Sequence, residues 1–93
     1  MTEEEILKRY GRKGVLTHLP AKQEARIEVL AWVASPFQPG VEYREAEVNE
    51  LLAGHEIDHV TLRRYLVDYG FLTRAAGVYQ LAPDAPKFIK TGA

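Results

Sequence analysis

Residues 61–72, with the sequence TLRRYLVDYGFL, constrain the fold more than any other stretch of this chain. Leu62, Leu66 and Tyr69 recur at helical spacing, which predicts a short helix with one face in a core. Gly70 is suited to end that helix, because glycine adopts positive φ without a steric clash at Cβ. The residues after it favour a strand. The segment therefore predicts a helix that stops at a glycine and passes directly into a β-strand.

The length and composition fit a single small globular domain. Ninety-three residues can bury one modest core. The chain has no cysteine, so it contains neither disulfides nor a Cys-based zinc site. No apolar run approaches the roughly 20 residues of a membrane span, and the acidic residues 3–5 differ from the basic start of a signal peptide. We therefore expect a cytoplasmic protein with no membrane partner.

The rest of the chain consists of short predicted elements. Thr2 and Glu5 have the spacing of a capping box, which predicts a helix over residues 3–10. Residues 12–20 are expected to be extended. Apolar periodicity and the positions of Pro and Gly predict the remaining order. We expect helices over residues 21–34, 45–53 and 58–69, and strands over residues 41–43, 71–74 and 78–81.

Some side chains within these helices can also be assigned. Val48, Leu51 and Leu52 are expected to face inward from the helix over 45–53, and Asp58 is a candidate N-cap for the next helix. Trp32 has two interpretations. It can belong to a central core helix that is contacted on two sides, or it can mark a dimer interface.

This order of elements is that of a winged helix-turn-helix, an α+β fold. It has a three-helix core, a short strand and a C-terminal β-hairpin wing. We expect residues 1–20 to be an N-terminal helical and extended segment, residues 21–82 the winged-helix domain, and residues 83–93 a loosely held tail. In this architecture residues 58–69 form the recognition helix, which is offered to the DNA major groove.

The charge of the chain sets a condition on DNA binding. The net charge is −1, whereas nucleic-acid-binding proteins usually have a basic excess or a basic face. Residues 22–56 are strongly acidic, and residues 55–74 carry equal numbers of positive and negative side chains. Attraction to phosphate must therefore come from local placement of basic residues.

Two arginines in the predicted recognition helix are the main candidates for DNA contact. Arg63 and Arg64 can bind guanine O6 and N7 bidentately, or pair with phosphates. The alternative for Arg64 is a surface ion pair with Asp68 at i, i+4. His59 and Thr61 lie nearer the start of the helix, from where side chains reach base edges. The alternative for Thr61 is that it only supports the start of the helix.

Further basic residues lie outside that helix. Lys8, Arg9, Arg12 and Lys13 form a basic cluster that can follow the phosphate backbone or enter the minor groove. The alternative is an ordinary solvated segment. Arg74 lies at the base of the predicted hairpin, whose small and uncharged tip argues against deep insertion into a groove. We expect Arg74 to make a weaker phosphate contact.

The sequence gives little support for a metal or a catalytic site. His55 and His59 have the i, i+4 spacing of some zinc sites. However, Gly54 and Asp58 indicate a helix boundary between them, and no third ligand is evident. No catalytic triad order, glycine-rich phosphate loop or pair of carboxylates stands out. We therefore predict no metal, no cofactor and no enzymatic activity.

Three motifs in a fixed order resemble a known family. They are LPAK at residues 19–22, Y-x-E-x-E-V-N-E-x-L at residues 43–52, and D-x-x-T-L-R-R-x-L-V-D-Y-G at residues 58–70. Over roughly residues 16–81 the chain resembles the prokaryotic domain of unknown function 2087. The resemblance implies a winged-helix-like domain that occurs alone or fused to bacterial transcriptional regulators. Two departures are Arg44, where the family tends to have a capping threonine, and Gln80, where it often has arginine.

Two functions from different classes follow from these observations. The first is a DNA-binding transcriptional regulator whose partner is double-stranded DNA, bound by a monomer or a homodimer. The alternative is a winged-helix module for protein–protein interaction, with a second copy or a regulatory protein as partner and no DNA contact. A sensory domain for a small ligand is a third interpretation. It rests only on the five tyrosines and one tryptophan, which are more often core residues.

Overall fold

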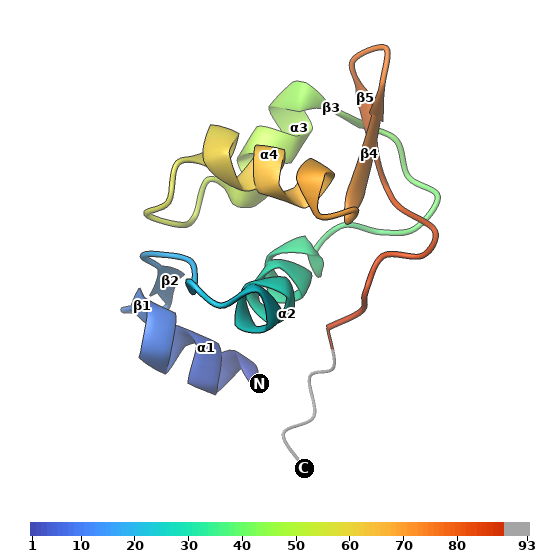
Figure 1. The fold of residues 1–93 in the computed structure, drawn as a ribbon. Coiled ribbons are helices and arrows are strands. Elements are labelled where there is room, and N and C mark those ends of the chain that lie inside the picture. The colour runs from blue at the N-terminus through green and yellow to red at the C-terminus, as the bar shows by residue number, and fades with distance from the viewer. Residues whose placement is uncertain (89–93) are drawn as a thin grey trace.

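The computed structural model describes residues 1–88 and has a mixed α+β fold, which confirms the predicted class. Four helices and two small antiparallel sheets make up the described residues. Helix α2 lies between α1 on one side and the α3–α4 pair on the other (Figure 1). The elements are α1 (Glu3–Tyr10), β1 (Gly11–Arg12), β2 (Val15–Leu16), α2 (Gln23–Ala34), β3 (Tyr43–Arg44), α3 (Glu45–Leu52), α4 (His59–Asp68), β4 (Leu72–Ala75) and β5 (Val78–Leu81).

The core is built around α2, which is apolar around most of its circumference. Its buried residues do not form one stripe, because neighbouring elements cover it from two sides. This confirms the interpretation of α2 as a central core helix. Trp32 is half-buried, and its indole Nε1–H donates to Glu3 Oε1 at 2.9 Å. The core residues contributed by other elements include Ile6, Leu16, Val48, Leu52, Leu62, Leu66, Phe71 and Tyr79.

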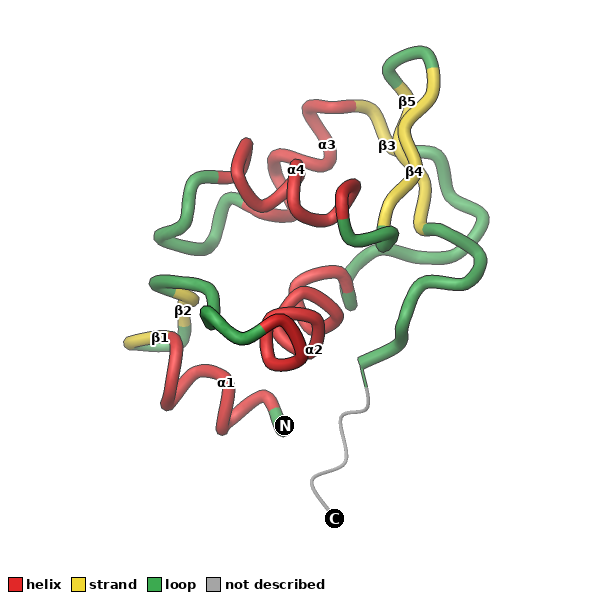
Figure 2. The backbone as a smooth tube through the Cα atoms, in the orientation of Figure 1, coloured by secondary structure: helices red, strands yellow, loops and turns green. Residues whose placement is uncertain are grey.

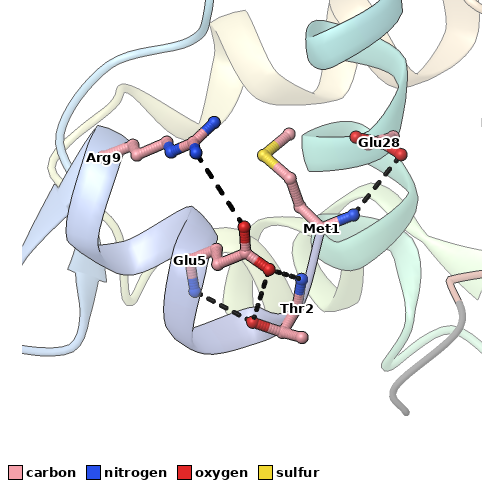
Figure 3. Close-up of polar contacts among 5 residues, drawn as sticks. All are labelled: Met1, Thr2, Glu5, Arg9 and Glu28. Atoms are coloured by element: carbon pink, nitrogen blue, oxygen red, sulfur yellow. Dashed lines mark hydrogen bonds and ion pairs between the residues drawn. The ribbon is translucent and has the colours of Figure 1, made fainter. Parts of the chain in front are cut away.

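The N-terminal segment contributes buried residues to this core. The predicted capping box of α1 is present, with Glu5 N–H donating to Thr2 Oγ1 at 3.1 Å and Thr2 N–H donating to Glu5 Oε1 at 3.3 Å (Figure 3). Ile6 and Leu16 are both fully buried. The only ion pair of the N-terminal amine in residues 1–88 is with Glu28 on α2, at 3.4 Å. These contacts fix α1 against α2.

Residues 12–20 are not simply extended as predicted, because a tight hairpin forms at their start. Strands β1 and β2 pair antiparallel, with Gly11 opposite Leu16. Lys13 and Gly14 between them have φ of 55° and 81°. Two consecutive residues with positive φ match the twist of a two-residue hairpin.

The second sheet has the strand order β3-β5-β4, with both pairs antiparallel. Figure 2 shows these strands beside the α3–α4 pair. The β4–β5 hairpin turns at Ala76 and Gly77, which have φ of 52° and 79°. Strand β3 is shorter than predicted and begins at Tyr43, so Val41 lies outside it and is exposed. This sheet packs at one end of the α3–α4 pair, with β4 following α4 almost at once.

The starts of α3 and α4 differ in part from the predictions. At α3, the Arg44 N–H donates to Glu47 Oε1 at 2.9 Å, which is one half of a capping box. The other half is absent, because arginine has no acceptor atom for a helix N–H. Asp58 is the N-cap of α4, but its side chain accepts no capping hydrogen bond. The expectation that Leu51 faces inward was wrong, since its exposed fraction is 38%.

The end of α4 confirms the prediction made from Gly70. Gly70 has φ of 80°. Its N–H donates to Val67 O at 3.1 Å, and Phe71 N–H donates to Leu66 O at 2.8 Å. This is the hydrogen-bond pattern of a Schellman motif, which ends the helix and directs the chain into β4.

The predicted tail is only partly described. Residues 83–88 contact the core through Ala85 and Phe88, both half-buried. Residues 89–93 of the predicted tail lie outside the described residues. None of the helices in residues 1–88 has both the length and the apolar character that crossing a membrane requires.

Candidate nucleic-acid interface

Helix α4 has one buried and one exposed face. Leu62 and Leu66 are fully buried and hold the helix on the core. On the opposite face, Thr61 and Arg64 are exposed, and Val60 has an exposed fraction of 46%. A large aliphatic side chain is thus presented to solvent beside a cation.

Two shallow hollows flank this exposed face. The first has a volume of about 380 Å³, and the second, between α4 and the β4–β5 hairpin, has a volume of about 300 Å³. Val60, Arg64 and Asp68 line both hollows, so these three residues form the ridge between them. Thr61 and Tyr65 complete the first hollow, and Arg63, Val67, Arg74 and Tyr79 complete the second.

Arg64 has no carboxylate partner among residues 1–88. The predicted alternative, an ion pair with Asp68, does not form within 4.0 Å, and no other acidic group of the described residues pairs with it. The guanidinium of an exposed and unpaired arginine keeps all five N–H donors available to a ligand.

Arg63 lies differently, although it is the adjacent residue. The exposed fraction of its side chain is 16%. Its Nη1 donates to Asn49 Oδ1 at 2.6 Å, and its Nη2 lies 3.6 Å from Glu45 Oε1. Its Cζ lies 5.9 Å from the centroid of the Tyr79 ring. Arg63 therefore joins α4 to α3 and to β5.

Arg74 extends the basic surface from α4 to the hairpin. Its Cζ lies 5.7 Å from the Tyr79 ring centroid, so the ring of this buried tyrosine is flanked by Arg63 and Arg74. The hollow between α4 and the hairpin thus has three arginines and one aspartate in its lining. The local charge is positive, although the whole chain carries −1.

The two residues predicted near the start of α4 occupy different positions. Thr61 is exposed and lines the first hollow. His59 lines neither hollow, and its Nδ1 lies 3.9 Å from Asp58 Oδ1. His55 is separated from His59 by a change of element, and its Nδ1 accepts a hydrogen bond from Leu16 N–H. Within residues 1–88 no group of three metal-ligating side chains is assembled.

The basic residues of the N-terminal segment are not brought together with Arg64. Arg9 lies on α1, which is separated from α4 by α2 (Figure 1). It pairs with Glu5 at 4.0 Å (Figure 3). Such exposed pairs contribute little to stability. Arg12 and Lys13 are exposed in the β1–β2 hairpin, and neither lines a hollow beside α4.

Val60 and Tyr79 were missed as site residues from the sequence. Val60 lies off the apolar stripe that Leu62 and Leu66 define, and an aliphatic residue outside the stripe is the signal that could have identified it. Tyr79 could not have been identified, because its contacts with Arg63 and Arg74 depend on how the hairpin packs against α4.

Residues 15–81 match the family described as an uncharacterized protein conserved in bacteria, DUF2087. The match runs from the start of β2 to the end of β5, so it covers α2, α3, α4 and the three-stranded sheet. The curated proteins and the solved structures contain no match to the chain. Because the family match spans well over half of the chain and includes both hollows, the chain belongs to the DUF2087 family.

Proposed function

We propose that this chain is a winged helix-turn-helix domain that binds double-stranded DNA and acts in transcriptional regulation. Helix α4 is the recognition helix, and the β4–β5 hairpin is the wing. The order α2, β3, α3, α4, β4, β5 and the sheet order β3-β5-β4 support this proposal. In this arrangement the second helix of the helix-turn-helix enters the major groove.

The observation that carries the proposal is the basic hollow between α4 and the hairpin. Three arginines from these two elements surround it, together with one aspartate. A positive, concave surface formed by a helix and a hairpin suits the edge of a duplex, where a groove and its phosphates lie side by side.

We assign a distinct role to each candidate residue of the interface. Arg64 and Thr61, which are exposed on α4, contact base edges, and Arg74 contacts the phosphate backbone beside the groove. Arg63 is the least exposed of the three arginines and mainly positions α4 relative to the hairpin, although it also lines the hollow. His59 lines neither hollow and has no part in the proposed interface. Arg9, Arg12 and Lys13 would add salt-dependent attraction to a duplex long enough to pass beyond the α4 face.

A second candidate function is a protein-interaction module. The observation in its favour is the exposure of aliphatic residues, with 46% for Val60 on α4 and 38% for Leu51 on α3. The outer side of α3 is also acidic, because Glu45, Glu47 and Glu50 are exposed. A second copy of the chain or a regulatory protein with a basic and apolar surface would fit this face.

The test is fluorescence anisotropy of a labelled mixed-sequence duplex, titrated with the protein at about 50 mM salt and at higher salt. DNA binding predicts an affinity that falls with salt and falls further in Arg64→Ala and Arg74→Ala. Lys87→Ala, which removes an exposed charge outside both hollows, is the matched control. An absence of binding at low salt would refute the DNA proposal and favour the protein-interaction module.

A further inference from the structure

We infer that the α4 ridge of Val60, Arg64 and Asp68 reads a thymine and a guanine about two base pairs apart in the major groove. Val60 contacts the thymine methyl group, and Arg64 binds the guanine. This inference rests on the proposed function and specifies which DNA the same site takes.

The first part of the inference comes from the exposure of Val60. This residue lies in the first turn of α4, where a recognition helix is closest to base edges. It contributes an exposed aliphatic surface to both hollows. Thymine is the base that offers an apolar group, its C5-methyl, in the major groove. Contact between the two removes apolar surface of both partners from water.

The second part comes from Arg64, one helical turn further along the ridge. No acidic group of residues 1–88 pairs with it, and a hollow on each side leaves space around its side chain. Guanine O6 and N7 are two acceptors that match the two-pronged donor set of arginine. Four residues of helix rise by about 6 Å, which is close to two base steps of about 3.4 Å each.

Asp68 is the third residue of the ridge. It lies at the last residue of α4, a further turn beyond Arg64. The ridge therefore presents an apolar group, a cation and an anion in that order.

The first experiment is selection from a randomised duplex pool with the wild-type chain and with Arg64→Gln. The wild type is expected to enrich one guanine with a thymine about two positions away. Glutamine pairs bidentately with adenine N6 and N7, so the variant is expected to enrich adenine at the guanine position. A consensus that is unchanged in Arg64→Gln would overturn the inference, because a merely structural Arg64 would not alter base choice in this way.

The second experiment uses only the wild-type chain, so that it does not depend on the folding of a variant. Replacing the selected guanine with 7-deazaguanine removes N7 and is expected to weaken binding about tenfold. Replacing the selected thymine with uracil removes the methyl group and is expected to weaken binding about threefold. Unchanged affinity for either modified duplex would refute the corresponding contact.

The outcomes separate this inference from the proposed function. Salt-dependent binding with no base preference would refute base reading by the ridge and leave the DNA-binding proposal in place. A lack of binding to any duplex in the pool would refute both.

Discussion

The backbone N–H of Leu16 donates a hydrogen bond to Nδ1 of His55, with the two nitrogens 3.1 Å apart. The carbonyl oxygen of Leu16 also accepts a hydrogen bond from Glu56 N–H at 2.9 Å. The His55 ring lies edge-on to Trp32, with ring centroids 5.4 Å apart. The N-terminal β1–β2 hairpin thus holds the loop between α3 and α4.

The His55 contact predicts a loss of stability in mild acid. Burial lowers the pKa of His55 from its ordinary 6.5, so the folded chain holds this ring neutral where the unfolded chain protonates it. The stabilisation is therefore complete above about pH 6.5 and is lost as the pH falls through the lower folded pKa. Urea unfolding at pH 7.5 and 5.5 measures this change, with Trp32 fluorescence as the local reporter.

His55→Asn is the informative variant for that experiment. The asparagine oxygen can accept the Leu16 N–H but does not titrate, so the pH dependence is expected to be smaller than in the wild type. His18→Asn, at an exposed position, serves as the control. If both variants keep the full wild-type pH dependence, the acid sensitivity does not come from His55.

The two adjacent arginines of α4 are expected to differ in their effect on folding. Arg63→Ala removes the hydrogen bond to Asn49 and the contact with Glu45, and should lower the free energy of unfolding by about 1.5–3 kcal/mol. Arg64→Ala should change it by less than about 0.5 kcal/mol, because Arg64 is exposed. Urea denaturation of both variants tests this contrast. Equal changes in the free energy of unfolding would contradict the conclusion that Arg63 joins α4 to α3 and β5.

The turn of the β4–β5 hairpin offers a stabilising substitution. Ala76 has φ of 52°, a left-handed conformation that disfavours alanine. Asparagine tolerates this conformation and is preferred before glycine in such turns. Ala76→Asn should therefore raise the free energy of unfolding by about 0.5–1 kcal/mol.

The control for this substitution is Ala53→Asn. Ala53 is also exposed, but it has φ of −71°, so the left-handed preference of asparagine brings no gain there. Thermal unfolding of both variants provides the comparison. A gain in both would point to a general effect of asparagine on the surface rather than to turn geometry.

The N-cap of α1 should contribute to the stability of the whole fold, although it lies at the chain terminus, because α1 covers one side of α2. Thr2→Ala removes the acceptor for Glu5 N–H and is expected to cost about 1 kcal/mol of stability. Thr2→Ser keeps the hydroxyl and should retain most of that stability. Hydrogen exchange of the α1 amides is the most direct measurement, and equal exchange rates in the two variants would contradict the assigned role of the hydroxyl.

The backbone features that could be predicted are those specified locally. The Thr2–Glu5 box and the Gly70 stop are set by residues within one turn, so the sequence alone was sufficient. The β1–β2 hairpin was missed because two-residue strands are too short to show alternation. Lys13-Gly14 was the available signal, since glycine is favoured in two-residue hairpin turns.

The site was less predictable because it depends on packing. The periodicity of α4 places Arg63 on the flank of the apolar stripe and Arg64 on the outer face, but it does not identify the partners of Arg63. These depend on the position of α3, which brings Asn49 to Arg63 from 14 residues earlier in the chain. Leu51 shows the same limit. Its spacing suits a core position, but the angle at which α3 packs leaves it exposed.

The Tyr79 ring between Arg63 and Arg74 has a consequence for the conformational entropy that binding a partner at the hollow would cost. Both guanidinium groups lie against one ring that is itself buried, so helix and hairpin are held at a set separation before any partner arrives. A ligand that bridges the two elements then meets a pre-organised surface and loses little conformational entropy by binding there. Shrinking this ring would loosen the geometry of the hollow without removing a single positive charge from it.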